Sequence, residues 1–175
     1  MCGITHIKFN KKNVKRKTQS GFAAVLCISR KGMVISMNID LEQIREHYKK
    51  DRFATGNGIV IDSVTEDCVV CSMELRESHE NAAGGIQGGA IFTLADLAFA
   101  VHCNLEMVCG ADIGVTVGQS CSISFLKGTR GNRLFAKSAC ISKGRSVSVY
   151  RISVEDNLGV RIAEMQANSF STARR

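Results

Sequence analysis

The sequence contains no proline, no tryptophan and no long hydrophobic run. No apolar stretch approaches the ~20 consecutive residues that a membrane-spanning helix requires, which excludes a protein anchored by such helices. At 175 residues the chain is long enough for one domain with a sizeable core.

The eight cysteines are scattered along the sequence, a spacing that does not suggest a disulfide framework. Most of them sit in apolar patterns, which favours a reduced, intracellular protein and predicts a cytoplasmic location. Cys68 and Cys71 have the spacing of a metal-binding pair, but no second pair or Cys/His cluster follows them. We therefore expect no metal site, and no nucleotide-binding or phosphate-loop motif is present. The cysteines are Cys2, Cys27, Cys68, Cys71, Cys103, Cys109, Cys121 and Cys140.

Acidic side chains are missing from the first 36 residues, which carry eight of the 23 lysines and arginines. The rest of the chain has 15 basic residues against 16 acidic ones, a net charge of −1, so the total of +7 comes from this leader. The body of the protein therefore gives no electrostatic reason to expect a nucleic-acid partner.

The leader has three interpretations. Residues 11–17 resemble a basic arm or part of a targeting peptide, and the apolar run 21–29 has the length of a short signal segment. No small-residue cleavage site follows this run, which argues against secretion. We prefer a third interpretation, in which a purine-rich, ribosome-binding stretch precedes a true start at Met33 or Met37. We expect residues 1–36 to be disordered or not part of the native protein.

Residues 37–175 carry regular helix and strand patterns and are expected to form one domain. Apolar positions at helical spacing predict a short amphipathic helix over 40–51 and a long apolar helix over about 88–104. Six strands are predicted at 59–64, 68–76, 113–125, 134–142, 146–154 and 160–170. One apolar helix wrapped by one antiparallel sheet is an α+β layout, and its open edges and face predict a dimer.

The clearest alternation of period two lies in the strand predicted at 113–125. Its apolar residues alternate with glycine, serine and threonine, which predicts a strand with one buried face. The apolar positions are Ile113, Val115, Val117, Cys121, Ile123 and Phe125.

Asp96 is the only charged side chain between Glu80 and Glu106, and it lies in the apolar helix. A carboxylate in a buried helix is costly unless it is paired, hydrogen-bonded or used, so Asp96 is a candidate site residue. The alternative is that Asp96 points to solvent or caps a neighbouring loop.

A long spaced pattern surrounds this residue: His79-Glu80-Asn81-x-x-Gly84-x-x-Gln87-Gly88-Gly89-x-x-Phe92-x-Leu94-Ala95-Asp96-x-Ala98-x-Ala100. It resembles the signature of hotdog-fold acyl-CoA thioesterases of the phenylacetate-degradation (PaaI) type. Residues 123–127 and the Gly144-Arg145 turn match in order and spacing, so the resemblance covers about 40–171. It implies a hotdog fold, in which five to six antiparallel strands wrap a long central helix, with a short N-terminal helix.

The resemblance also implies a reaction, the hydrolysis of aryl- or medium-chain acyl-CoA. Asp96 would attack the thioester carbonyl or activate a water, and the N–H of Gly88 would polarise the carbonyl oxygen. Asn81 would position the water or the thioester, and Thr116 is the best match to an assisting hydroxyl on the next strand. No cofactor is implied, since coenzyme A is part of the substrate. The expected substrate contacts are Gln87, Gly89, His79, Phe92, Lys143 and Arg145.

Gln87 and His79 each allow more than one role. The family often has histidine where this chain has Gln87, and glutamine forms hydrogen bonds but cannot titrate. Gln87 therefore orients the thioester or closes the loop. His79 also has a structural interpretation, in which it holds the loop before the helix.

Gly88 and Asp96 are eight residues apart, which is roughly 12 Å along one helix. One helix cannot bring both to one carbonyl, so we expect Gly88 of one subunit to work with Asp96 of its partner. A homodimer, assembled further into a dimer of dimers, is also what the resemblance implies.

Two other functions remain open. A hotdog hydratase or dehydratase would pair an acid with a histidine, but Asp96 and His102 are six apart rather than five, and the proline-rich histidine segment of the dehydratases is missing. A non-catalytic acyl-CoA-binding protein would keep the pocket, although it would not need Asp96.

Overall fold

A computed structural model describes residues 25–29, 32–36, 38–111 and 116–172. The chain divides into two compact units, residues 1–38 and 39–175.

The described part of the first unit is a hairpin of two antiparallel strands, β1 (Val25–Ser29) and β2 (Gly32–Ser36), in which Ser29 lies opposite Gly32. The basic segment 11–17 lies outside the described residues. The expectation that residues 1–36 are disordered or non-native therefore stays a prediction.

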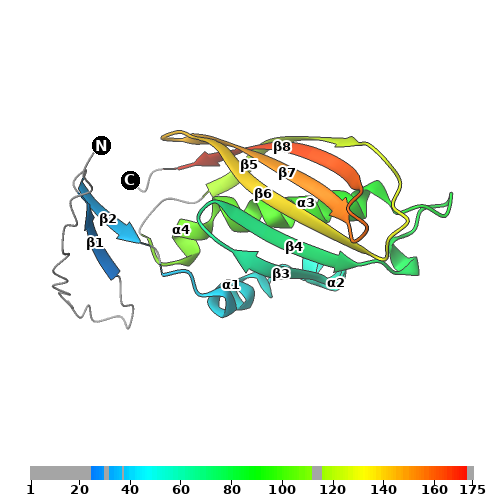
Figure 1. The fold of residues 1–175 in the computed structure, drawn as a ribbon, viewed down its shortest axis with the longest axis horizontal. Helices are drawn as coiled ribbons and strands as arrows, with labels where there is room; N and C mark the ends of the chain where they lie inside the picture. The colour runs from blue at the N-terminus through cyan, green and yellow to red at the C-terminus, as the bar shows by residue number, and fades with distance from the viewer. Residues whose placement is uncertain (1–24, 30–31, 37, 112–115, 173–175) are drawn as a thin grey trace, which may run out of the picture. The chain divides into compact units, whose positions relative to one another are not determined.

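The second unit is a long helix on one face of a six-stranded antiparallel sheet (Figure 1). The strands lie in the order β3–β4–β6–β7–β8–β5, and every neighbouring pair is antiparallel. This arrangement confirms the predicted α+β layout and the hotdog fold. The elements are α1 (Leu41–Tyr48), α2 (Arg52–Gly56), β3 (Ile59–Val64), β4 (Cys68–Glu74), the 3₁₀ turn η1 (Glu77–His79), α3 (Gly88–Cys103), α4 (Leu105–Val108), β5 (Thr116–Phe125), β6 (Arg133–Lys143), β7 (Val147–Asp156) and β8 (Arg161–Ser171).

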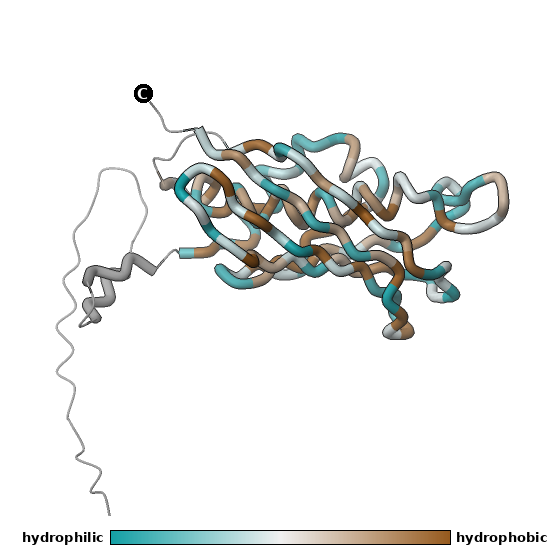
Figure 2. Tube along the Cα trace, turned by 90° about the horizontal axis from the view of Figure 1, so that it is seen from above, coloured by the Kyte–Doolittle hydropathy of each residue, from teal (hydrophilic) through white to brown (hydrophobic). Residues whose placement is uncertain are grey.

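The core lies between α3 and the face of the sheet that it covers. In β7, Ile152 and Val154 are fully buried while Arg151 is exposed. Figure 2 shows hydrophobic and hydrophilic residues interspersed along the strands. From α3, Leu94 and Val101 are fully buried. Burial of such side chains stabilises by about 1.5–3 kcal/mol each, which holds α3 on the sheet.

The helix predicted over 40–51 is observed as α1, which ends three residues earlier, and it is followed by a second short helix, α2, that was not predicted. Asp40 caps α1 by accepting hydrogen bonds from the N–H groups of Glu42 (3.0 Å) and Gln43 (3.3 Å). Asp51, the last residue of the predicted helix, instead caps α2 by accepting from Ala54 N–H at 3.0 Å. No helix within the described ranges is long and apolar enough to cross a membrane.

The strand predicted at 113–125 does not have one buried face. Residues 112–115 lie outside the described residues, and within β5 only Thr116 is buried. The register of β5 against β8 shifts between Gly118 and Ser120, so residue 119 is an extra residue in the strand.

Because of this bulge, the apolar residues of β5 before and after residue 119 face opposite sides of the sheet. Val117 lies opposite the exposed Phe170, whereas Cys121 lies opposite the buried Ala167, so Val117 and Cys121 face opposite sides of the sheet. Helix α3 packs mainly on β4 and β6, while β5 is an edge strand. Phe125 therefore stays 54% exposed although it lies on the helix side, opposite buried Ala163.

Candidate active site

Asp96 lies on the side of α3 that the sheet does not cover. The accessible residues of this helix form one stripe, in which Asp96 is the only charged side chain. The expected burial of Asp96 is wrong for the single chain, because the apolar residues around it turn toward the sheet and Asp96 turns away. No described residue forms a hydrogen bond or ion pair with its carboxylate. The stripe consists of Gly88, Gly89, Phe92, Thr93, Asp96, Ala100 and Cys103.

The carboxyl group of Asp96 is nevertheless perturbed. Partial loss of water around it is the larger cause and raises its pKa above 3.8, and the like charge of Asp51 raises the pKa further. Asp51 is the residue that caps α2. An ionised carboxylate with a raised pKa is a stronger base at neutral pH than an ordinary one.

The N-terminus of α3 presents unused hydrogen-bond donors. Gln87 stands at the N-cap without a side-chain capping bond, and its carbonyl accepts from Ala90 N–H (3.0 Å) and Ile91 N–H (3.3 Å). Among the described residues, nothing accepts a hydrogen bond from the N–H of Gly88 or Gly89. These donors and the helix dipole suit an oxygen that becomes negatively charged.

An open pocket of about 420 Å³ adjoins this helix end. It lies between the start of α3 and the end of β5, with a wall that continues into the β5–β6 loop. A Cβ atom on residue 88 would lie 3.1 Å from Cζ of Phe125, so glycine is what lets the ring approach the helix. The lining residues are Ile86, Gly88, Ile91, Phe125, Leu126, Lys127, Gly128 and Thr129.

The loop before α3 is held by Asn81 and His79. Oδ1 of Asn81 accepts from the N–H groups of Ala83 (2.9 Å) and Gly85 (3.2 Å), which folds the loop onto itself. His79 is buried; its Nδ1 accepts from Arg76 N–H at 3.2 Å, and its carbonyl accepts from Gln87 N–H at 2.7 Å. His79 thus has the contacts of a loop-holding residue, and Asn81 keeps its Nδ2 amide as the available donor.

The other expected site residues are spread along α3 and the sheet. Phe92 is half-buried on α3, one turn above the glycines. Thr116 is buried and its hydroxyl lies 2.8 Å from that of Ser171. Lys143 pairs with Glu106 of α4, and Arg145 is exposed in the turn after β6. The structure therefore groups Gln87, Gly88 and Gly89 at one end of α3, whereas Lys143 lies by α4, which follows the other end.

His102 does not face Asp96. It is buried against the sheet, with Nδ1 3.1 Å from Ser138 Oγ and Nε2 3.2 Å from the Glu66 carbonyl oxygen, and burial lowers its pKa. This geometry gives no support to the hydratase alternative, in which a histidine must work beside the acid. In β4, Cys71 is buried and Cys68 is half-exposed, on opposite faces as expected for residues three apart on a strand. No group of three potential metal ligands occurs within the described part of the chain.

Two features of the site were missed in the sequence. The helix predicted over 40–51 ends at Asp51, whereas in the structure Asp51 caps the start of α2; the signal was an aspartate ahead of a second helix start. Phe125 was assigned only to a buried strand face, and nothing local shows that it reaches Gly88. That contact depends on how β5 lies against α3.

Comparisons with known proteins identify the family and agree with the fold. The sequence profile of the thioesterase superfamily matches residues 83–163. The acyl-coenzyme A thioesterase PaaI of Escherichia coli is 30% identical over 123 residues, which cover 70% of this chain and 84% of that protein. The solved structure of E. coli PaaI, from the phenylacetic acid degradation operon, has a TM-score of 0.66 at 26% identity and covers 76% of this chain and 96% of its own. A Streptococcus mutans protein solved with acetyl CoA has a TM-score of 0.58 at 24% identity, covering 67% and 90%. The chain therefore belongs to the thioesterase superfamily, as a thioester hydrolase with a PaaI-type hotdog fold.

Proposed function

We propose that this protein hydrolyses aryl- or medium-chain acyl-CoA to the free acid and coenzyme A, at a site shared by two copies of the chain. The observation that carries the proposal is a lone carboxylate, Asp96, on the uncovered side of a helix whose N-terminus presents unused N–H groups. The E. coli relative described as an acyl-coenzyme A thioesterase supports the choice of substrate.

The shared site follows from helix geometry. Gly88 and Asp96 of one chain are eight residues apart on α3, about 12 Å at 1.5 Å per residue, so they do not meet at one carbonyl carbon. A second copy packed against the uncovered stripe of α3 and the open edge of β5 would bring its Asp96 to the Gly88 of the first. It would also cover both Asp96 side chains, which raises their pKa further.

In the reaction, the Asp96 carboxylate attacks the thioester carbonyl carbon directly, or removes a proton from a water that attacks it. The carbonyl oxygen takes the negative charge and is stabilised by the N–H of Gly88, with Gly89 beside it. Collapse of the tetrahedral centre breaks the carbon–sulfur bond and releases the CoA thiolate. When Asp96 is the nucleophile, this step leaves an acyl anhydride on its carboxylate, and a water then hydrolyses the anhydride to the free acid and the restored carboxylate. When Asp96 is the base, the hydroxyl of the water stays on the acyl carbon, the acid leaves directly, and Asp96 returns its proton to solvent. Gln87 cannot supply a proton, so the thiolate takes it from water.

The remaining residues have supporting roles in this proposal. The Nδ2 amide of Asn81 and the side chain of Gln87 orient the thioester or the water, while His79 keeps their loop in place. Phe92 contributes to the wall around the bound thioester, and the Thr116 hydroxyl assists from β5. Lys143 and Arg145 meet CoA phosphates. We further propose a cytoplasmic protein assembled as a dimer of dimers, with no resident cofactor.

The test is the release of CoA thiol from a panel of acyl-CoA thioesters by the wild type and by Asp96→Asn. Loss of a catalytic base or nucleophile lowers kcat by two or more orders of magnitude, about 10²–10⁴-fold. Equal folding stability of the two proteins would show that the loss is chemical, because Asp96 forms no hydrogen bond in the single chain.

Complementation tests the shared site. Gly88→Val adds a side chain where the Phe125 ring already approaches and blocks access to the N–H. If Asp96→Asn and Gly88→Val chains are unfolded and refolded together, half of the dimers carry one intact site, and about a quarter of wild-type activity returns. No recovery would place the site within one chain. A wild type that binds every acyl-CoA but hydrolyses none would favour the non-catalytic alternative.

A further inference from the structure

We propose that the pocket between the start of α3 and the end of β5 receives the acyl group, and that Phe125 sets the size of the acyl group accepted. This inference rests on the proposed function, because it assumes that the thioester carbonyl binds at Gly88.

The position of Phe125 is the first observation. The far edge of its ring lies at the helix N-terminus, with Cζ 3.1 Å and both Cε atoms 3.5 Å from the place of a Cβ on residue 88. The side chain is 54% exposed, so the ring is not part of the closed core. Any group bound through its carbonyl to the Gly88 N–H therefore has this ring as a neighbour.

The chemistry of the pocket is the second observation. Four of its lining side chains are apolar, and Lys127 is the one charged residue among them. Such a lining offers few hydrogen bonds or ion pairs to the polar, multiply charged end of CoA, whereas an aliphatic or aryl acyl chain buries apolar surface against it. The four apolar residues are Ile86, Ile91, Phe125 and Leu126.

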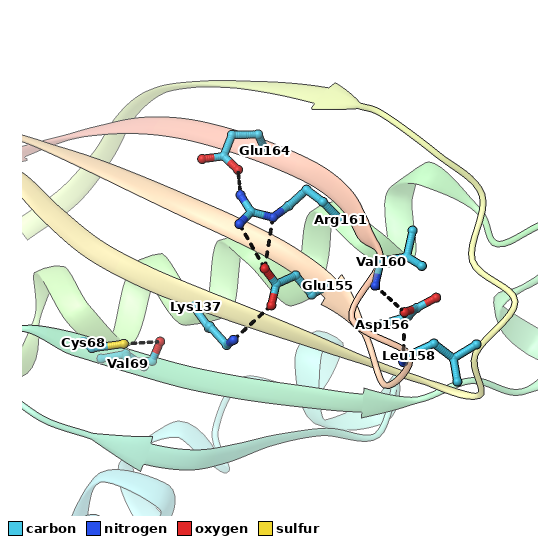
Figure 3. Close-up of polar contacts among 9 residues, drawn as sticks. All are labelled: Cys68, Val69, Lys137, Glu155, Asp156, Leu158, Val160, Arg161 and Glu164. Atoms are coloured by element: carbon cyan, nitrogen blue, oxygen red, sulfur yellow. Dashed lines mark hydrogen bonds and ion pairs between the residues drawn. The ribbon is translucent and has the colours of Figure 1, made fainter.

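The wall beyond Phe125 is held in place, which a size-selective pocket requires. Leu126 N–H donates to the Ile162 carbonyl at 2.8 Å, and the Thr129 hydroxyl donates to Oδ2 of Asp156 at 2.9 Å. The other oxygen of Asp156 accepts from the N–H groups of Leu158 (3.0 Å) and Val160 (2.9 Å), as Figure 3 shows. The β7–β8 turn thus anchors the loop that forms this part of the pocket wall.

The experiment compares kcat/KM over straight-chain acyl-CoA of increasing length and over phenylacetyl- and benzoyl-CoA. For Phe125→Ala, kcat/KM for the acyl group that the wild type prefers falls about tenfold, because an aromatic contact is lost, and chains too long for the wild type gain by a similar factor. Phe125→Leu keeps an apolar side chain and disturbs the packing less, so its acyl preference shifts by an intermediate amount. This variant replaces Phe125→Ala if the alanine variant does not fold.

Phe170→Ala is the matched control, because Phe170 is also an exposed phenylalanine of the sheet but lies on the face away from α3, opposite Val117. Its acyl profile stays that of the wild type. Identical profiles for the Phe125 and Phe170 variants would overturn the inference.

A binding assay separates this inference from the proposed function. The affinities of intact acyl-CoA thioesters are measured in the Asp96→Asn protein with and without Phe125→Ala. A changed preference among acyl groups supports the pocket even if the wild type hydrolyses nothing, which would overturn only the proposed reaction. An unchanged preference overturns the pocket assignment.

Discussion

At the scale of single residues, the raised pKa of Asp96 has two sources, and one can be removed without changing the reacting group. Partial dehydration belongs to the position of Asp96 on α3. The like charge belongs to Asp51, which lies at the start of α2. The pH dependence of the enzyme should therefore respond to a residue that does not touch the substrate.

Asp51→Asn is expected to shift the acidic limb of the kcat/KM profile to lower pH. Under the proposed function Asp96 acts when ionised, so activity falls as pH drops through its pKa, and removal of a nearby negative charge lowers that pKa. Asparagine also caps helices, so α2 is retained. The measurement is the pH profile of both proteins at one ionic strength. If the acidic limb stayed at the same pH in Asp51→Asn, the charge of Asp51 would not affect the pKa of Asp96.

At the scale of elements, the end of the sheet near the pocket is held by one buried carboxylate. Asp156 is only 3% exposed and accepts hydrogen bonds from the β5–β6 loop and from its own turn. Burial by itself would raise its pKa, but the bonds from Val160, Thr129, Leu158 and Arg130 outweigh burial and hold the pKa below 3.8.

Because the folded-state pKa of Asp156 is lowered, its stabilising effect is present above the unfolded value near 3.8 and is lost as pH falls through the folded value. Asp156→Asn should lower Tm at pH 7 and make Tm less sensitive to acid. The Tm of both proteins is measured by circular dichroism between about pH 2.5 and 7, a range that spans the titration of carboxyl groups.

Glu155→Gln is the control for that measurement. Glu155 lies next to Asp156 but belongs to an accessible ion-pair network with Lys137 and Arg161, continued by Arg161 to Glu164 (Figure 3). Accessible ion pairs contribute about 0–1 kcal/mol, so Tm changes little. An equal loss of Tm in both variants would show that Asp156 has no special anchoring role.

At the scale of the whole molecule, β5 is the element that a single chain leaves incomplete. It is an edge strand, its helix-facing side is barely covered by α3, and it ends at the pocket. Long exposed edges that carry apolar residues are usually covered in native proteins, here by a second copy under the proposed function.

Ile123→Lys should therefore separate the subunits and reduce activity together, because Ile123 faces the helix side of β5, opposite buried Met165. Sedimentation velocity and CoA release on the same samples provide the test. The control is Val60→Lys on β3, the opposite edge of the sheet, where Val60 is 46% exposed. A monomeric Ile123→Lys protein with full activity would contradict the shared site.

The spacing of apolar residues predicted an element correctly where the same period ran through the whole element. The strand predicted at 59–64 matches β3 residue for residue, and the helix predicted over about 88–104 matches α3 to within one residue. It failed where one residue changed the pattern: Asp51 caps a second helix that was not predicted, and the extra residue at 119 exchanges the faces of β5.

The candidate site divides in the same way. Asp96, Gly88 and Gln87 could be singled out from the sequence, because a single acidic residue in an apolar helix that begins with glycines is a recognisable pattern. The sequence by itself therefore determined the fold class, the family resemblance and the choice of Asp96.

The direction in which those residues face depends on tertiary packing. The accessibility of Asp96, the contact of Phe125 with Gly88 and the anchoring of the pocket wall by Asp156 join segments far apart in the chain. Such contacts depend on where α3 lies across the sheet and on the register of β5, which are set by packing of the whole core rather than by any local pattern.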